Sequence, residues 1–165
     1  MESALVEVGI PTADGLFVAR YSKRGLCGLE FPGRHFGKKF GAVRRGPASR
    51  WRVMTQRALR TALAGKRPAK LPPLDLSAGT PFQQQVWRRL TTIPAGKTLS
   101  YGEVAKSIGR AKAVRAVGGA CGANPIPVLV PCHRVLAANG RLGGFSGGLR
   151  WKRMLLLREG VGQPG

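Results

Sequence analysis

Acidic side chains are scarce in this sequence. Seven Asp and Glu residues stand against 28 Lys and Arg, which gives the 165 residues a formal net charge of +21. This excess is larger than solubility requires. It predicts a polyanionic partner, either nucleic acid or an anionic membrane surface. After residue 76, thirteen basic residues accompany only two carboxylates, Glu103 and Glu159. Each of these two carboxylates therefore needs an explanation.

Long apolar runs are also missing. No uninterrupted apolar segment approaches the roughly 20 residues that cross a membrane. The chain opens with Met1-Glu2, without a basic segment followed by an apolar core. We therefore expect a soluble protein that is not exported, and a cytoplasmic, nucleoid-associated one if the source is prokaryotic. This expectation favours nucleic acid over a membrane as the partner.

Cysteine is rare, with three residues that lack the spacing of a disulfide framework: Cys27, Cys121 and Cys132. An odd, scattered set favours a reducing compartment over a disulfide scaffold. Zinc is disfavoured because Cys27 and His35 lack a second closely spaced pair and no C-x-x-C occurs. We expect neither a metal nor a cofactor.

Residues 1–76 have the pattern of a small sheet with one helix packed on it. Short β-prone runs between turn-forming residues predict a three-stranded meander, with strands at Leu5–Ile10, Leu16–Tyr21 and Leu26–Phe31. The Gly- and Arg-rich segment from Pro32 to Pro47 predicts a mobile basic loop. An amphipathic helix should follow, capped by Ser49 and ended by Gly65. Nothing in this half indicates chemistry, so we assign it a supporting role.

Strong helix-start signals mark the second half. A boundary at Ser77-Ala78-Gly79 would separate domains 1–76 and 77–165. Thr80-Pro81-Phe82-Gln83 then combines a capping threonine, a proline at the first helical position and a glutamine three residues after the cap. Ser100-Tyr101-Gly102-Glu103 is a second capping box, which gives Glu103 a structural explanation. A third helix is expected from Lys112 to about Cys121.

The second and third of these helices, joined through Gly109, have the pattern of a helix-turn-helix in a basic segment. A helix that reads bases in the major groove needs several Asn, Gln, Arg or Glu side chains. The third helix offers mainly Ala, Val and Gly, together with Lys112 and Arg115. A smooth surface of such small side chains can approach DNA closely without reading its bases. It favours a protein that binds DNA without sequence specificity over an operator-specific repressor.

The segment Val128–Val135 carries the strongest indication of chemistry. Its apolar run predicts a buried strand that stops at Pro131, which has no N–H, and holds Cys132 at the end of a rigid element. A thiolate is a nucleophile, and an imidazole close by could take the thiol proton. In extended backbone the side chains of Cys132 and His133 diverge, so contact would need a turn or a bridging water. An inert buried cysteine and a structural histidine remain the alternatives.

Glu159 stands where a carboxylate is unfavourable. A final helix is expected over Leu149–Arg158, and a negative charge at its C-terminal end opposes the helix dipole. A function is therefore indicated, since a carboxylate can fix the tautomer of a histidine and stabilise its cation. The Gly-rich segment Arg141–Gly148, with Phe145 and Ser146, lacks the Lys-Ser/Thr of a nucleotide P-loop and suits close approach to a flat base.

Pro131-Cys132-His133-Arg134-Val135 is the signature of the O6-alkylguanine-DNA alkyltransferases, and the chain resembles that family from Thr80 to Glu159. Five further motifs follow the family's order: Phe82-Gln83-Gln84-Gln85-Val86-Trp87, Ser100-Tyr101-Gly102-Glu103-Val104-Ala105, Ala113-Val114-Arg115-Ala116-Val117-Gly118, Asn124-Pro125 and Phe145-Ser146-Gly147-Gly148. The first half resembles the family only in layout. The resemblance implies an α/β (α+β) fold, with a small ribonuclease-H-like domain before a winged helix-turn-helix-type domain.

The resemblance also implies catalytic roles. Cys132 would accept the alkyl group, His133 would act as base through a water, and Glu159 would orient His133. Tyr101 would assist nucleotide flipping and donate to the base. Asn124 would order the active-site turn.

Positions that contact DNA and line the pocket follow from the same resemblance. Arg115 would fill the gap left by the flipped nucleotide while the helix-turn-helix docks in the minor groove. The other DNA-binding positions are Lys112, Ala113, Gly118 and Ala123, together with Tyr101. The pocket positions are Val130, Val135, Phe145, Ser146 and Gly147. The Val130 and Cys132 carbonyls would accept from the guanine amino group. Phe145 lacks the hydroxyl of the tyrosine found in many members, so only an aromatic wall remains there.

The implied activity is DNA repair by direct transfer. The alkyl group of O6-alkylguanine in double-stranded DNA would move to Cys132, with O4-alkylthymine an open second substrate. Because a thioether is no leaving group, each protein molecule would react once. The protein is expected to be a monomer. Three alternatives remain: an alkylation sensor, which would lack the cysteine; a Cys-His-Glu hydrolase; and a DNA-packaging protein in which Cys132 is incidental.

Overall fold

A computed structural model describes residues 5–35 and 37–162. Its first half contains the predicted antiparallel meander, in the order β1 (Val6–Thr12), β2 (Gly15–Tyr21) and β3 (Leu26–Glu30). The turn between β1 and β2 is tight because Gly15 has φ 118°, a conformation that residues with a side chain rarely adopt. The sheet thereby brings its apolar face to one side of the chain, where the next helix packs.

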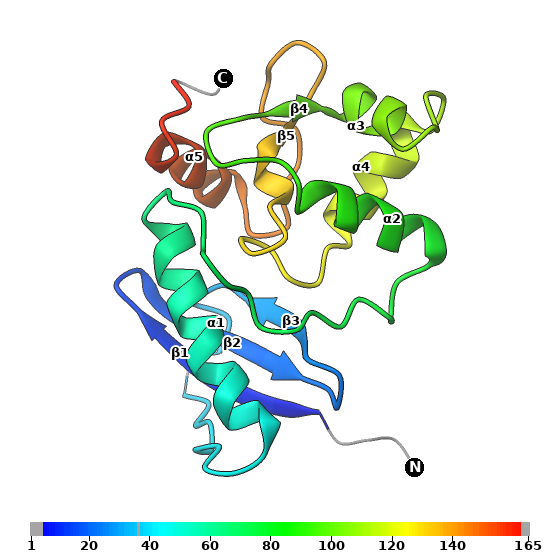
Figure 1. Cartoon of the computed structure of the whole chain (residues 1–165). Helices are drawn as coiled ribbons and strands as arrows, with labels where there is room; N and C mark the ends of the chain where they lie inside the picture. The colour runs from blue at the N-terminus through cyan, green and yellow to red at the C-terminus, as the bar shows by residue number, and fades with distance from the viewer. Residues whose placement is uncertain (1–4, 36, 163–165) are drawn as a thin grey trace.

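Helix α1 (Pro47–Leu63) covers one face of this sheet (Figure 1). It begins before the predicted Ser49 cap, because Gly46 turns the chain at φ 82° and no side chain caps the helix. The Ser49 hydroxyl instead donates to the Gly46 carbonyl at 2.8 Å. Gly65, at φ 79°, follows the end of the helix as predicted. The residues buried against the sheet are Thr55, Ala58, Leu59, Ala62 and Leu63.

The second half opens with the three predicted helices, α2 (Pro81–Leu90), α3 (Tyr101–Ser107) and α4 (Val114–Gly122). Thr80 and Gln83 make both hydrogen bonds of the predicted capping box, at 3.0 and 3.1 Å. The box at Ser100 is only half formed. The Ser100 hydroxyl accepts from the Glu103 N–H at 3.0 Å, and among the described residues the Ser100 N–H makes no return bond to the Glu103 carboxylate. That carboxylate still lies near the positive end of α3, where it is favourable.

The predicted strand over Val128–Cys132 is wrong. Residues 125–130 form a turn instead, which we call the buried turn, and Val128 within it has φ 73°. The chain then continues into a 3₁₀ turn, Cys132–Arg134. The prolines at 125, 127 and 131 supply no N–H to a ladder, and the Val130 N–H donates within the turn, to the Ile126 carbonyl at 2.9 Å, so the apolar run does not pair as a strand. Regular pairing begins only afterwards, where β5 (Val135–Leu136) runs parallel to β4 (Leu99–Ser100).

Helix α5 (Leu149–Arg158) has its predicted bounds and closes the second half. It buries Leu155 and Leu156, as expected of an amphipathic helix, and it also buries Lys152 completely. None of the helices in residues 5–35 and 37–162 combines the length and hydropathy needed to cross a membrane.

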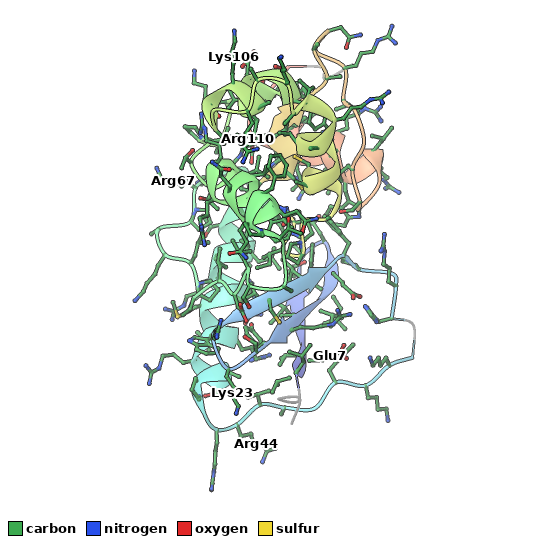
Figure 2. All side chains as sticks on the ribbon, turned by 90° about the vertical axis from the view of Figure 1, so that its right-hand side faces the viewer. Glu7, Lys23, Arg44, Arg67, Lys106 and Arg110 are labelled. Carbon is green, nitrogen blue, oxygen red and sulfur yellow. The ribbon has the colours of Figure 1, made fainter. Side chains whose placement is uncertain are left out.

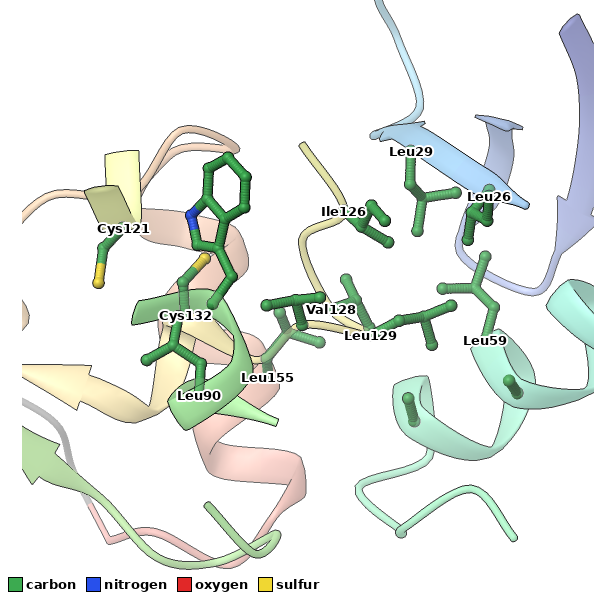
Figure 3. Close-up of a cluster of buried hydrophobic side chains, with 14 of the residues drawn as sticks. Leu26, Leu29, Leu59, Leu90, Cys121, Ile126, Val128, Leu129, Cys132 and Leu155 are labelled. Atoms are coloured by element: carbon green, nitrogen blue, oxygen red, sulfur yellow. The ribbon is translucent and has the colours of Figure 1, made fainter. Parts of the chain in front are cut away.

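The hydrophobic core runs across the predicted domain boundary. Figure 3 shows Ile126 and Leu129 of the buried turn facing Leu29 of β3 and Leu59 of α1. The Leu29 N–H also donates to the Pro125 carbonyl at 2.9 Å. The fold is therefore mixed α/β, as predicted, with one core shared by both halves. The division into two domains after residue 76 stays a prediction.

Candidate active site

Cys132 lines a cavity of about 440 Å³ whose other walls come from α3, α4 and the loop before α5. Only 3% of the residue is exposed, so a reactant must enter this cavity to reach the thiol. An inverse γ-turn at Pro131 fixes the residue, because the Cys132 N–H donates to the Val130 carbonyl at 2.8 Å. The remaining lining residues are Tyr101, Gly118, Cys121, Gly122, Gly144, Phe145 and Ser146.

Asn124 holds the buried turn that delivers Cys132. Its side-chain nitrogen donates to the Val130 carbonyl at 2.8 Å, and its side-chain oxygen accepts from the Ile126 N–H at 3.0 Å. These two bonds replace backbone pairing that the prolines prevent. The geometry thus places Asn124 where the resemblance puts a residue that orders the turn.

His133, Arg134 and Glu159 form a buried charged cluster behind Cys132. His133 Nε2 lies 2.8 Å from Glu159 Oε1, and Arg134 Nη2 donates to the same oxygen at 2.7 Å. Arg134 Nε donates to Glu159 Oε2 at 3.0 Å, and Arg134 Nη1 donates to the Ile93 carbonyl at 2.6 Å. Burial alone would raise the pKa of Glu159, but hydrogen bonds from His133 and Arg134 outweigh it and lower that pKa to about 2. Glu159 is therefore an anion.

His133 has one ring nitrogen bound and one unbound. With a carboxylate at Nε2, the proton of the neutral ring is assigned to that nitrogen. Nδ1 is then an acceptor, and it is the one buried side-chain N or O atom without a hydrogen-bond partner in the described residues. Burial lowers the pKa of His133, while Glu159 opposes that shift. A neutral imidazole with a free Nδ1 is equipped to take a proton.

The charge around the thiol is set by a lysine that the sequence did not predict for this place. Lys152 of α5 is fully buried, and Nζ donates to the carbonyls of Val135 at 2.7 Å and Gly144 at 3.2 Å. Burial raises the pKa of Cys132, and an Asn124 hydrogen bond and the Lys152 charge partly oppose it. The resting thiol therefore keeps its proton, and Lys152 favours the thiolate once it forms.

Tyr101 forms a wall of the cavity with its phenol inside. Burial raises the pKa of Tyr101 to about 12, with smaller contributions from Cys121 and Cys132, so the hydroxyl remains a donor. Gly143 passes directly over it, since a Cβ at that position would lie 2.9 Å from the Tyr101 oxygen. The Lys152 ammonium lies 5.9 Å from the ring centroid on the same side of the site.

The first half of the chain packs directly against the pocket loop, residues 143–148. Phe31 lies 5.7 Å from Phe145 between ring centroids, and a Cβ at Gly147 would approach the Phe31 ring to 2.4 Å. Arg34 Nη2 donates to the Ser146 carbonyl at 2.9 Å. The half expected to be a passive support therefore fixes the position of a pocket wall.

The predicted pocket residues divide into two groups. Phe145 and Ser146 line the cavity, whereas Gly147, Val130 and Val135 do not. The two valines are fully buried in the core. The Val130 carbonyl accepts from the Asn124 side chain and from the Cys132 N–H, both at 2.8 Å. Its expected bond to a guanine amino group stays a prediction.

Helix α4 presents the smooth surface that its sequence predicts. Arg115, Lys112 and Ala123 are exposed, and Ala113 and Gly118 are partly exposed. A Cβ added at Gly118 or Gly122 would meet nothing within 4 Å, and both glycines line the cavity that contains Cys132. The helix expected to contact DNA thus borders the mouth of the pocket.

Sequence reasoning missed four residues that shape this site: Phe31, Arg34, Arg134 and Lys152. Arg134 stands inside the signature motif, and a buried Glu159 requires a cationic partner, so these two signals together could have found it. Lys152 occupies an inward position of an amphipathic helix, which was the available signal. In residues 5–35 and 37–162, no group of three or more His, Cys, Asp or Glu is placed to hold a metal ion.

Curated relatives match different lengths of the chain. The "Bifunctional transcriptional activator/DNA repair enzyme Ada" of Escherichia coli is 40% identical over 147 residues, covering 84% of this chain and 40% of that protein. A "Methylated-DNA--protein-cysteine methyltransferase" of Mycobacterium tuberculosis is 59% identical over 86 residues, or 52% of each chain. The aligned part of this chain thus spans about two fifths to half the length of these relatives.

Solved structures and a family model cover the fold. The structure of Mycobacterium tuberculosis OGT in complex with DNA matches with a TM-score of 0.73 and 37% identity, over 96% of this chain and 94% of that one. The methyltransferase of Pyrococcus kodakaraensis matches with a TM-score of 0.62 and 26% identity, over 96% and 100%. The family model described as "6-O-methylguanine DNA methyltransferase, DNA binding domain" matches residues 81–161. The chain therefore belongs to the 6-O-methylguanine DNA methyltransferase family.

Proposed function

We propose that this protein repairs O6-alkylguanine in double-stranded DNA by moving the alkyl group to its own Cys132. The observation that carries the proposal is the placement of Cys132 in a cavity backed by the His133–Glu159 pair. The cavity, of about 440 Å³, has room for a small molecule, which must enter it to reach the buried Cys132 thiol. The names of the relatives, methylated-DNA--protein-cysteine methyltransferases, agree with this chemistry.

The first step is activation of the thiol. Because burial holds the Cys132 pKa high, the proton must be removed at the moment of reaction. The free Nδ1 of His133 takes it through one bridging water, and the Glu159 carboxylate stabilises the resulting imidazolium. Arg134 keeps Glu159 ionised throughout. Lys152 lies close enough to stabilise the thiolate.

The second step is displacement at the alkyl carbon. The sulfur of Cys132 forms a bond to that carbon while the bond from carbon to the guanine oxygen breaks, and the electron pair leaves with the guanine. The phenol of Tyr101, which keeps its proton, donates a hydrogen bond to the departing guanine. The product is a thioether that no residue of the site can cleave. Each molecule therefore acts once.

The third requirement is access to a base that is normally stacked. Extruding the nucleotide costs a few kcal/mol, less where alkylation has already weakened the pair. The exposed glycines of α4 let the helix approach the groove closely, and Arg115 occupies the space the nucleotide leaves. We expect phosphate contacts to dominate affinity, without sequence specificity. The Mycobacterium tuberculosis relative was solved in complex with DNA.

We also propose that the chain forms two domains. Residues 1–76 would form a ribonuclease-H-like support and residues 77–165 a winged helix-turn-helix-type domain that binds DNA and accepts the alkyl group, in a monomer. The antiparallel sheet with one packed helix supports the first part. The contacts of Phe31 and Arg34 with the pocket loop indicate that the support also positions the site.

Mass measurement tests the proposal directly. The protein is incubated with a duplex containing one O6-methylguanine, and intact and peptide masses are recorded. We expect one added methyl group per molecule, on Cys132, without turnover at excess substrate. The variant Cys132→Ser should bind the duplex and gain no mass. Binding by the unaltered protein without a mass gain would favour an alkylation sensor or a packaging protein instead.

A further inference from the structure

Helix α1 carries an exposed row of arginines. Its 17 residues include four Arg and no Asp or Glu. Positions 50, 53, 57 and 60 fall within an arc of about 80° on a helix that advances roughly 100° per residue, and all four residues are exposed. We call Arg50, Arg57 and Arg60 the α1 stripe. Its charges lie side by side on one face of the helix.

No acidic residue offsets the α1 stripe in the part of the chain that the structure describes. The four carboxylates of residues 5–35 and 37–76 are all engaged with other partners: Glu7 with Arg20 and Lys38, Asp14 with Arg158, Glu30 with Arg20 and His35, and Asp75 with Ser22 and Ser77. The ion pairs of the described residues do not include any member of the stripe. Its positive charge is therefore left to solvent or to a partner.

The α1 stripe is separate from the surface expected to deliver damaged DNA. In Figure 1, α1 covers the sheet in the lower half of the molecule, while α4 lies in the upper half, behind α2. The cavity with Cys132 opens beside α4, since Gly118 and Gly122 line it. Figure 2 shows Arg44, which precedes α1, extending from the lower end of the molecule, away from Lys106 and Arg110. A polyanion bound by α1 would not compete for the pocket.

We propose that the α1 stripe binds the phosphate backbone of a second DNA segment, distinct from the one at the pocket. This inference rests on the proposed function, which makes DNA the polyanion that the protein meets. Guanidinium groups bind phosphate oxygens in a bidentate manner, and a row of them follows a backbone without reading bases. The protein would then bridge two DNA segments and stay attached to one while it tests the other.

An anionic membrane is the competing partner, and the composition of the stripe disfavours it. Helices that lie on membranes insert an apolar face with several large side chains. The exposed face of α1 offers one, Val53, which is 44% exposed. The inward face of the helix is already occupied by the sheet. DNA therefore fits this surface better than lipid does.

Capture of one duplex by another tests the inference with the full chain. An undamaged duplex is immobilised, protein is added, and retention of a second, fluorescent undamaged duplex is measured across a salt series. The variant Arg50→Gln/Arg57→Gln/Arg60→Gln removes the charges, and Arg50→Lys/Arg57→Lys/Arg60→Lys keeps them; all three residue types favour helix similarly. We expect the Gln variant to retain at least tenfold less duplex, with a salt slope shallower by about 2.7 for three lost phosphate contacts. The Lys variant should retain most of the capture.

Each other outcome overturns the inference. Capture by the Gln variant equal to that of the unaltered protein would show that bridging does not use α1. Equal loss in the Lys and Gln variants, with unchanged melting temperatures, would show that charge is not what matters. If the Gln variant keeps capture but loses binding to vesicles with anionic lipid, the stripe is a membrane surface. Methyl transfer to Cys132 from one short damaged duplex is measured separately. Its absence in the unaltered protein rejects the proposed function, and the capture of undamaged DNA still decides the inference.

Discussion

Glu159 ends α5, where a carboxylate opposes the helix dipole, and its position makes sense only through its partners. The carboxyl oxygens accept from Arg134 and His133 inside the protein, and only 2% of the side chain is exposed. The unfavourable position was visible in the sequence, and the buried contacts with His133 and Arg134 account for it. The catalytic role of Glu159 stays a prediction. Arg134 was missed because the need for a cation beside Glu159 becomes plain only once that carboxylate is known to be buried.

The acid stability of the protein should depend on Glu159. Its pKa falls from an ordinary 4.5 to about 2 in the folded state, so the ionised carboxylate stabilises the fold above pH 4.5 and this contribution disappears as pH falls toward 2. The shift corresponds to a free energy of unfolding on the order of 3 kcal/mol. In urea unfolding, Glu159→Gln should be less stable than the unaltered protein at pH 7, and the difference should shrink between pH 5 and pH 2.

The exposed Glu103 provides the control for this titration. Glu103→Gln should change the free energy of unfolding by less than about 0.5 kcal/mol at either pH. A difference for Glu159→Gln that stays constant with pH would mean that Glu159 titrates normally and has no special charge partners.

Lys152 should control the reactivity of Cys132 through charge. Methionine has a side chain of similar length to lysine but carries no charge. In Lys152→Met the Cys132 thiolate therefore loses its nearby cation, and more free energy is needed to ionise the thiol. One pKa unit corresponds to about 1.4 kcal/mol, or tenfold in thiolate population. We expect single-turnover methyl transfer at pH 7 to slow by about tenfold, with the pH profile displaced upward. If methyl transfer slows but its pH profile does not move, Lys152 has only a structural role, through its hydrogen bonds to the Val135 and Gly144 carbonyls.

Secondary-structure elements differ in how well local sequence determines them. The helix after Thr80 was predicted because its start depends on neighbours within three residues, and both capping bonds are present. The strand predicted at Val128 was wrong because apolar residues indicate burial and not the form of the backbone. Asn124 and three nearby prolines decide that form, through hydrogen bonds that no periodicity reveals.

The pocket loop should depend on Phe31 of the neighbouring half. A Cβ at Gly147 would lie 2.4 Å from the Phe31 ring, so Gly147→Ala must displace either the loop or the ring. We expect a loss of about 1–3 kcal/mol in the free energy of unfolding, which is the usual effect of overpacking, and slower methyl transfer. Phe31→Leu in the same chain should recover much of both losses.

A matched control lies within the same loop. A Cβ at Gly144 would meet nothing within 4 Å, so Gly144→Ala should leave stability nearly unchanged. If Phe31→Leu fails to rescue Gly147→Ala, the two halves are not coupled through this contact.

The net charge of the protein and its hydrophobic core could be predicted from the sequence to different degrees. The excess of basic residues indicated a polyanionic partner at once, since charge is additive along the sequence. The shared core was not predictable, because contacts such as Leu29 with Pro125 join residues almost a hundred positions apart. The function of the first half changes accordingly, from passive support to a body that holds the pocket loop.

Variants of the two exposed cations near the start of α4, Lys112 and Arg115, should distinguish DNA binding from nucleotide extrusion. Lys112 and Arg115 are both exposed near the start of this helix, and each carries one positive charge. If phosphate contact were their whole function, Lys112→Ala and Arg115→Ala would weaken binding to undamaged and damaged duplexes equally. Arg115 should do more, because a side chain that fills the gap in the stack offsets part of the few kcal/mol that extrusion costs.

We therefore expect Arg115→Ala to slow methyl transfer at saturating damaged duplex at least tenfold, while its affinity for undamaged duplex falls only as far as that of Lys112→Ala. At saturating duplex the rate of methyl transfer no longer depends on affinity, so a slower rate reflects slower or less favourable extrusion of the nucleotide. A duplex in which the O6-methylguanine lies opposite a gap, already unstacked, should restore most of the rate to Arg115→Ala and change little for Lys112→Ala. Parallel losses in the two variants on every substrate would make Arg115 an ordinary phosphate contact and leave extrusion to other residues of the pocket mouth.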